Sequence, residues 1–158
     1  MTGLEPRMKH PAFVLPGAYE ALLALSRSTK NQGVPDTTLY MVELRASQIN
    51  GCSYCCAMHA AEMRAAGESA ERIDTVAAWR EAPWFSDAER AALALTEALT
   101  RLADRPDAVS DEIWDEVTRH YDEKGCAALV VTIASINVWN RTNAATHQIA
   151  VAAKSKAA

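Results

Sequence analysis

The sequence predicts an all-α protein of about six or seven helices, because helical apolar periodicity recurs along most of the chain. Its 158 residues are 49% hydrophobic, and they include only six Gly and six Pro. Alanine and leucine are abundant, and both lose little side-chain freedom in a helix. A chain of this length typically buries about 70% of the surface that its unfolded form exposes. We therefore expect a single domain over residues 1–158.

The N-terminal region predicts an arm followed by a first helix. Residues 1–16 contain three prolines and show little periodicity, so we expect an extended arm that packs on the domain or on a neighbouring subunit. A helix is expected from about Ala18 to Lys30, since Gly33 and Pro35 stop the apolar pattern.

Three further helices are expected before residue 80. Asp36 is a good N-cap for the first of them, which ends at Asn50-Gly51. The next begins at Cys52 and ends at Gly67, where a glycine can adopt the left-handed conformation of a helix C-terminus. Ser69 then caps a short helix that ends near Trp79.

The C-terminal half predicts three more helices. Ser86 and Glu89 form the Ser-x-x-Glu pattern of a capping box, which opens a helix that carries Leu102 and ends at Pro106. Ser110 opens the next helix, whose expected buried side is Ile113, Trp114, Val117 and Tyr121. An apolar, Ala-rich run from Cys126 to about Thr146 is long enough to be a central buried helix.

The charge pattern argues against two classes of partner. The chain has 16 basic and 20 acidic side chains, and it has no block of Lys or Arg interleaved with aromatic residues. We therefore expect no nucleic-acid partner and no membrane partner. No apolar run reaches the ~18 residues of a membrane span, and the first residues lack the apolar core of a signal peptide, so we expect a cytoplasmic protein.

The segment from Arg45 to His59 departs from ordinary helical packing. It reads Arg-Ala-Ser-Gln-Ile-Asn-Gly-Cys-Ser-Tyr-Cys-Cys-Ala-Met-His and holds three of the four cysteines of the chain. Cysteines this close together are kept reduced in the cytosol. A Cys-x-x-Cys pair there is more typical of a catalytic or metal-binding site than of a structural bridge.

A helix that starts at Cys52 places Cys55 about one turn further along, so both sulfurs lie on one face within reach of a disulfide. Unpaired N–H groups at a helix start lower the pKa of a thiol, and the thiolate is the form that attacks peroxides and disulfides. His59 follows Cys55 by one turn and can take up or relay the proton. We therefore predict a two-electron redox site of Cys52, Cys55 and His59. Cys56 points about 100° away and is expected to be a core residue or a bystander.

Two other interpretations of these residues stay open. The cysteines can be an inert, buried thiol pair in a helix. Alternatively, Cys52, Cys55 and His59, together with Cys56, can bind zinc. A structural zinc site usually takes four ligands from two separated pairs, however, and no second pair is visible. We expect neither a metal ion nor a cofactor.

The Arg45–His59 segment resembles the core motif of the AhpD-like alkylhydroperoxidases, within the carboxymuconolactone decarboxylase superfamily. Two later segments are similar to the small single-domain branch of that family. They read Trp-Arg-Glu-Ala-Pro-Trp-Phe-Ser-Asp-Ala-Glu-Arg-Ala-Ala-Leu-Ala-Leu-Thr-Glu and Ile-Asn-Val-Trp-Asn-Arg. The resemblance covers roughly Pro16 to Thr146.

This resemblance implies an all-helical subunit that assembles into homotrimers or hexamers and reduces organic hydroperoxides in antioxidant defence. Cys55 matches the cysteine that attacks the peroxide, and Cys52 matches the one that resolves the sulfenate as a disulfide. His59 matches the histidine of a proton relay. A protein or small-molecule dithiol regenerates the pair in that family, so a dithiol reductant is the implied partner.

The chain departs from the family pattern at two places. The relay glutamate of the family usually lies 12 residues before the first cysteine, where this chain has Tyr40. Glu43 is one helical turn later and is the candidate replacement, although a step of three residues changes the direction by about 60°. Some members carry a histidine between the two cysteines, where this chain has Ser53-Tyr54.

A function of a different class also stays open. The protein can be a non-enzymatic redox sensor or assembly scaffold, whose cysteine pair oxidises slowly and alters contact with a partner. The decarboxylase branch of the superfamily fits less well, because the decarboxylation of a lactone has no evident use for a dithiol.

Overall fold

The computed structural model describes residues 3–103 and 105–151, and within these ranges all regular secondary structure is helical. The expected all-α fold is therefore confirmed. The elements are α1 (Pro11–Val14), α2 (Ala18–Ser28), α3 (Asp36–Asn50), α4 (Ser53–Ala65), α5 (Ala70–Thr75), the 3-10 helix η1 (Val76–Ala78), α6 (Asp87–Thr100), α7 (Asp111–His120) and α8 (Glu123–Thr146).

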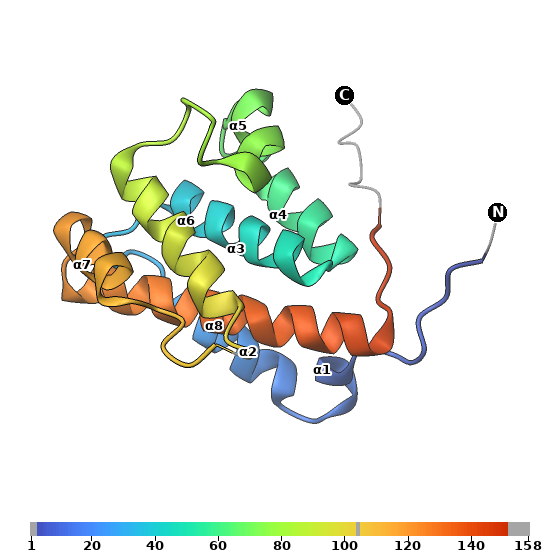
Figure 1. Cartoon of the computed structure of the whole chain (residues 1–158). Coiled ribbons are helices and arrows are strands. Elements are labelled where there is room, and N and C mark those ends of the chain that lie inside the picture. The colour runs from blue at the N-terminus through green and yellow to red at the C-terminus, as the bar shows by residue number, and fades with distance from the viewer. Residues whose placement is uncertain (1–2, 104, 152–158) are drawn as a thin grey trace.

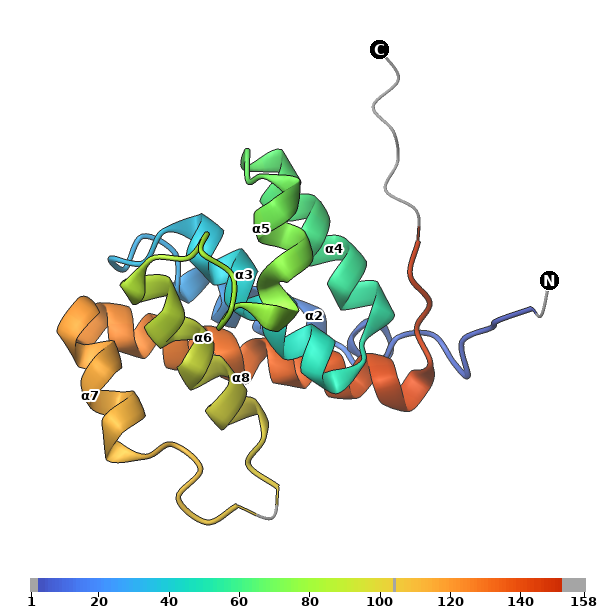
Figure 2. The same ribbon diagram turned by 45° about the horizontal axis from the view of Figure 1, so that its top comes forward.

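Helices α3 and α8 organise the molecule. Helix α8 runs across the molecule in both views (Figures 1 and 2). Helix α3 packs against α4, α6 and α8. Helix α2 packs on α8, and α7 packs on α6 and α8. Within the described ranges, no helix has the length and apolar character that a membrane crossing needs.

Helix α3 holds two hydrophobic cores together. Leu39 and Val42 join a core with α6, α7 and α8, whereas Met41 and Leu44 join a second core with α4, α5 and α6. All four side chains are buried. Each contributes roughly 1.5–3 kcal/mol by leaving water, so the backbone between them is held firmly from two sides. Glu43 lies within this stretch.

Most helix boundaries follow the capping residues in the sequence. Cys52 is the N-cap of α4, and Gly67 beyond its end has the left-handed φ of 89°. Ser69 caps α5, and α5 continues through η1 to Trp79. Both hydrogen bonds of the Ser86–Glu89 capping box at α6 are present. These starts and stops confirm the sequence predictions.

The N-terminal arm differs from its prediction because it is not extended throughout. Residues 11–14 form the short helix α1, in which Pro11 occupies the first turn and His10 is the N-cap. The Nδ1 atom of His10 accepts a hydrogen bond from the Ala12 N–H at 3.1 Å. A proline at this position is compatible with a helix because its missing N–H would have no intrahelical partner anyway.

The start of α3 differs from its prediction by one residue. Asp36, the expected N-cap, is the first helical residue, and Pro35 is the N-cap.

Two predictions in the C-terminal half were wrong. Helix α6 ends at Thr100 rather than at Pro106, because Arg101 leaves the helical conformation, and Leu102 is therefore 51% exposed. Trp114 lies on α7 but is 40% exposed, and Val117 is the buried residue of that helix. Periodicity predicts which way the apolar face of a helix points. How much of that face is buried depends on how the neighbouring helices pack against it.

Candidate active site

Cys52 and Cys55 form a disulfide across the first turn of α4. Their Cα atoms are 5.4 Å apart. The Cys55 N–H also donates a hydrogen bond to Cys52 Sγ at 3.3 Å, so the sulfur of Cys52 is the side-chain cap of the helix. The two residues are only 4% and 1% exposed. The spacing argument is thus confirmed in its geometry: both sulfurs lie on one face and pair.

The other two cysteines are free thiols. Cys56 is half-buried and packs against the core that α3 forms with α4, α5 and α6. Cys126 is buried in the core with α7 and α8. Burial raises the pKa of both thiols, which disfavours the reactive thiolate. This agrees with the expectation that neither belongs to the redox site.

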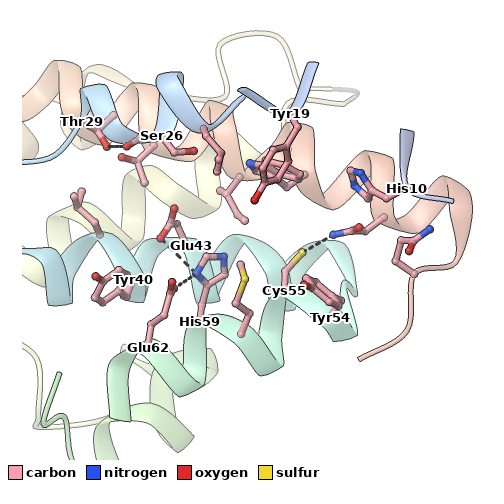
Figure 3. A pocket seen from close by; sticks show the side chains of 18 of the residues that line it. His10, Tyr19, Ser26, Thr29, Tyr40, Glu43, Tyr54, Cys55, His59 and Glu62 are labelled. Carbon is pink, nitrogen blue, oxygen red and sulfur yellow. Dashed lines mark hydrogen bonds and ion pairs between the residues drawn. The ribbon is translucent and has the colours of Figure 1, made fainter. Parts of the chain in front are cut away.

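His59 lies on the same buried face of α4 as Cys55. Its Nδ1 atom is 2.8 Å from Oε2 of Glu62 and 3.4 Å from Oε2 of Glu43. Figure 3 shows the two carboxylates on either side of the ring. A carboxylate can only accept a hydrogen bond, so Nδ1 carries the proton in these contacts. The other ring nitrogen, Nε2, is buried and has no hydrogen-bond partner among the described residues. Nε2 is therefore the nitrogen that can exchange a proton with a group entering the site.

The two carboxylates beside His59 differ in burial. The Glu43 side chain, from α3, is 17% exposed, whereas that of Glu62, from α4, is 40% exposed. Burial raises the pKa of the Glu43 carboxyl, and the attraction of His59 opposes this to a smaller degree. Tyr40, at the position of the family's glutamate, lies one turn from Glu43 and stacks under the Lys30 ammonium, 4.3 Å from the ring centre.

Asn143, near the end of α8, reaches both sulfurs. Its Nδ2 atom lies 3.1 Å from Sγ of Cys55 and 3.6 Å from Sγ of Cys52, and its side chain is buried. An amide N–H at this distance stabilises a thiolate more than a thiol, because the donor meets a full negative charge. Asn143 thereby adds to the effect of the α4 N-terminus on Cys55.

A cavity of about 420 Å³ lies against Cys55 and His59. Figure 3 shows Glu43, Glu62 and His59 grouped at one part of it, with Cys55 and Tyr54 beside them and Tyr19 on the opposite wall. Much of the remaining wall is apolar or aromatic, formed by Phe13, Leu23, Leu39, Met58, Ile136 and Trp139. The cavity therefore suits an organic molecule that presents one polar, reactive group to Cys55.

The same acidic pair also has the ligand types of a cation site. One atom each from Glu43, His59 and Glu62 lie within 4.8 Å of one another. Two carboxylates and an imidazole suit a divalent transition metal. The zinc site considered from the sequence used the cysteines instead, and two of those, Cys52 and Cys55, are paired with each other.

Sequence reasoning missed two residues of this site. Glu62 follows His59 by three residues on α4, a spacing that brings side chains into contact and could have revealed it. Asn143 is 88 residues from Cys55. Its signal was a polar row at three-residue spacing, Asn137, Asn140 and Asn143, in an otherwise apolar helix. Asn140 and Asn137 both accept hydrogen bonds from Asn50, at 2.9 and 3.0 Å, and so help to tie α8 to the end of α3.

Comparison with known proteins shows the family to which this chain belongs. Residues 16–98 match the carboxymuconolactone decarboxylase family. The chain belongs to that family. It is 36% identical over 132 residues to the uncharacterised protein YdfG of Bacillus subtilis (strain 168), covering 84% of this chain and 88% of that protein.

Solved structures of other proteins have a similar fold. A protein of unknown function from Agrobacterium tumefaciens, suggested to be the antioxidant defence protein AhpD, matches with a TM-score of 0.86 and 30% identity, over 94% of this chain and 100% of that chain. The debrominase Bmp8, as a C82A variant with 2,3,4-tribromopyrrole, matches with a TM-score of 0.77 and 22% identity, over 89% of this chain and 74% of that chain. The AhpD-like resemblance is confirmed, and a shared fold does not by itself fix the chemistry.

Proposed function

We propose that this protein is a thiol-dependent peroxidase that reduces organic hydroperoxides through a cycle of Cys52 and Cys55 between dithiol and disulfide. The observation that carries the proposal is the pairing of these cysteines at a helix N-terminus, with Cys55 on the wall of a largely apolar cavity. The buried His59, held by two carboxylates, stands in the same wall. Reduction of an organic hydroperoxide requires a helix N-terminus that stabilises the thiolate, a cavity large enough for an organic molecule, and a group that exchanges protons.

In the proposed oxidative half of the cycle, the thiolate of Cys55 attacks one oxygen of the hydroperoxide. The S–O bond forms as the O–O bond breaks, and the alkoxide leaves with a proton delivered through Nε2 of His59 as an alcohol. Cys55 is then a sulfenic acid. The thiolate of Cys52 attacks the sulfur of Cys55, the S–O bond breaks, and the hydroxide leaves as water after protonation. The product is the Cys52–Cys55 disulfide, which a dithiol reduces in the second half.

Assembly into a homo-oligomer, a trimer or a hexamer, is part of the proposal. Helix α2 has no buried residue, although it has Leu22, Leu23 and Leu25 along it. Leu25 is exposed, Leu22 and Leu23 are partly buried, and Phe13, Val14 and Leu15 before the helix are exposed. An apolar surface of this extent on α1 and α2 favours contact with another subunit. A thiol cycle of this kind also suits a reducing compartment such as the cytoplasm.

The proposed activity is tested by following the consumption of an organic hydroperoxide, such as cumene hydroperoxide, with dithiothreitol as the reductant. The native protein is expected to consume peroxide catalytically, well above the rate of the same concentration of free thiol. The Cys56→Ser variant is the matched control and is expected to keep the native rate, because Cys56 belongs to the core. Turnover no faster than free thiol would favour the redox-sensor function instead.

The raised pKa of Glu43 predicts a pH dependence of the oxidative half-reaction. Glu43 loses its charge at a higher pH than an ordinary carboxyl, whose pKa is 4.5. As the pH is lowered, the rate of Cys55 oxidation is therefore expected to begin to fall while the pH is still above 4.5. Neutral Glu43 no longer places a negative charge beside the ring of His59. Glu43→Gln is expected to remove this acid limb and to lower the rate at neutral pH on the order of 10²-fold.

Glu62→Gln is the matched control for this prediction, because Glu62 contacts the same ring nitrogen but is more exposed. It is expected to keep the acid limb. Stopped-flow rates of the reduced proteins with hydroperoxide between pH 4 and pH 8 measure both effects. A native profile in Glu43→Gln together with a lost limb in Glu62→Gln would assign the relay to Glu62.

A further inference from the structure

A second cavity lies beside Cys52, between the start of α4 and the end of α8. It measures about 380 Å³ and is lined by Cys52, Gly51 and Ser53 at the start of α4, by Asn143, Ala144 and His147 at the end of α8, and by Leu4, Glu5, Gln148 and Ile149. Cys52 does not line the first cavity, and Cys55 does not line the second. The disulfide therefore joins a cysteine that faces one cavity to a cysteine that faces another.

The wall of the second cavity is built from both ends of the chain. The Arg7 N–H donates to the carbonyl of Thr146 at 2.9 Å, and Nε2 of Gln148 donates to the carbonyl of Met8 at 3.0 Å. These bonds fix the N-terminal arm beside the end of α8. In Figure 1 the arm and the segment after α8 run out from the same end of that helix. The cavity is therefore a formed part of the fold.

We propose that the second cavity is the entry site for a small dithiol that reduces the disulfide by attacking Cys52. The proposal rests on the thiol peroxidase cycle above and adds to it a separate site for the reductant. The hydroperoxide and its alcohol product occupy the first cavity, at Cys55. The two substrates of the cycle then reach the same disulfide through different cavities, and the alcohol need not leave before the dithiol arrives.

The direction of thiol–disulfide exchange supports this placement. An attacking thiolate approaches one sulfur along the line of the S–S bond, from the side opposite the leaving sulfur. An attack on Cys52 therefore comes from the side away from Cys55, and the second cavity is lined by Cys52 and not by Cys55. A dithiol thiolate forms a bond to Sγ of Cys52, the bond between Cys52 and Cys55 breaks, and Cys55 leaves as a thiolate. The second thiol of the reductant then attacks the reductant sulfur that is bonded to Cys52. The bond to Cys52 breaks, and Cys52 is released as a thiol.

Asn143 favours Cys55 as the leaving sulfur. Its amide donates to Sγ of Cys55 at 3.1 Å, closer than to Sγ of Cys52 at 3.6 Å. A stabilised thiolate leaves faster in this exchange. The thiolate that forms is also the one that attacks the next hydroperoxide, so the reductive half returns Cys55 to its reactive state.

Filling each cavity separately tests the proposal. Ala144 lines the second cavity and is exposed on α8, and Met58 lines the first cavity and is also exposed. Ala144→Trp is expected to slow reduction of the disulfide by dithiothreitol on the order of tenfold, with oxidation of the reduced protein by hydroperoxide unchanged. Met58→Trp is expected to slow the oxidation and to leave the reduction unchanged.

Each half-reaction is measured alone. The protein is oxidised with diamide for the reduction assay, so no hydroperoxide is present, and free thiols are alkylated after an acid quench and counted by mass spectrometry. Ala145→Trp is the matched control, because Ala145 is the next residue of α8, is exposed, and lines neither cavity. It is expected to show native rates in both assays and so to report any general effect of a tryptophan on this helix.

A third measurement locates the attacked sulfur. A brief exposure of the oxidised protein to mercaptoethanol, followed by the same quench and peptide mapping, is expected to place the adduct on Cys52. An adduct on Cys55, or equal reduction rates in Ala144→Trp and Ala145→Trp, would overturn the proposal. If hydroperoxide fails to oxidise the reduced native protein, the peroxidase function fails, whereas the reduction rates and the adduct position still decide how thiols reach the disulfide.

Discussion

Replacement of Cys55 by serine is expected to reduce hydroperoxide turnover to the rate of the reductant alone, a loss on the order of 10³-fold or more. Serine keeps the size of the side chain, but its hydroxyl does not ionise near neutral pH and cannot accept oxygen from the peroxide. The donors that stabilise the thiolate, the Asn143 amide and the start of α4, then have no charge to stabilise. The coupled assay with dithiothreitol measures this loss directly.

Cys52→Ser is expected to give a different result, and the difference assigns the two roles. Cys55 still reacts once with hydroperoxide in this variant, but no intramolecular disulfide can form. The intact mass of the protein is expected to increase by one oxygen, trapped as the sulfenic acid, before further oxidation. A variant that keeps full turnover without Cys55, or that gains oxygen on Cys52, would reverse the assignment.

Replacement of Glu97 by glutamine is expected to destabilise the fold by about 3 kcal/mol at neutral pH, because it leaves the charge of a buried partner unpaired. Glu97 is 7% exposed at the junction of α3, α6 and η1. Its carboxylate accepts hydrogen bonds from Arg45 at 2.6 and 2.8 Å, from Nε1 of Trp79 at 3.0 Å and from Arg80 at 2.6 Å. Arg45 begins the cysteine segment, so this cluster also holds α3 in place beside the site.

The pH dependence of this effect follows from the Glu97 carboxyl. Burial alone would raise its pKa, but the hydrogen bonds from Arg80, Arg45 and Trp79 prevail and lower the pKa from 4.5 to about 2. A lowered pKa stabilises the fold where the unfolded carboxyl is ionised, above 4.5, and this contribution is lost as the pH falls from there toward 2. The difference between native protein and Glu97→Gln in urea unfolding is therefore expected to be full at pH 7 and smaller at pH 3.

The control for this prediction is Glu116→Gln. Glu116 pairs with Arg119 and His120 on the exposed side of α7, where water and salt screen the charges. It is expected to leave the urea midpoint unchanged at both pH values. A Glu97→Gln variant whose loss is the same at pH 3 and pH 7 would show that packing, and not charge, explains its instability.

Most of the helices and the pairing of Cys52 with Cys55 could be predicted from the sequence. Cap residues such as Ser86 and Gly67 act through hydrogen bonds and φ values within a few residues, so they predict where helices begin and end. The shared face of Cys52, Cys55 and His59 follows from the same local geometry, because a step of three or four residues returns to one side of any α-helix.

The surroundings of that pair depend on how the helices pack against one another. Glu43 meets His59 because α3 packs against α4, although the three-residue step from Tyr40 had pointed it away from the expected direction. Asn143 reaches the sulfurs from the end of α8, and the exposure of Trp114 depends on how little of α7 its neighbours cover. Contacts of this kind depend on the angle and distance between helices, which the period of one helix does not contain.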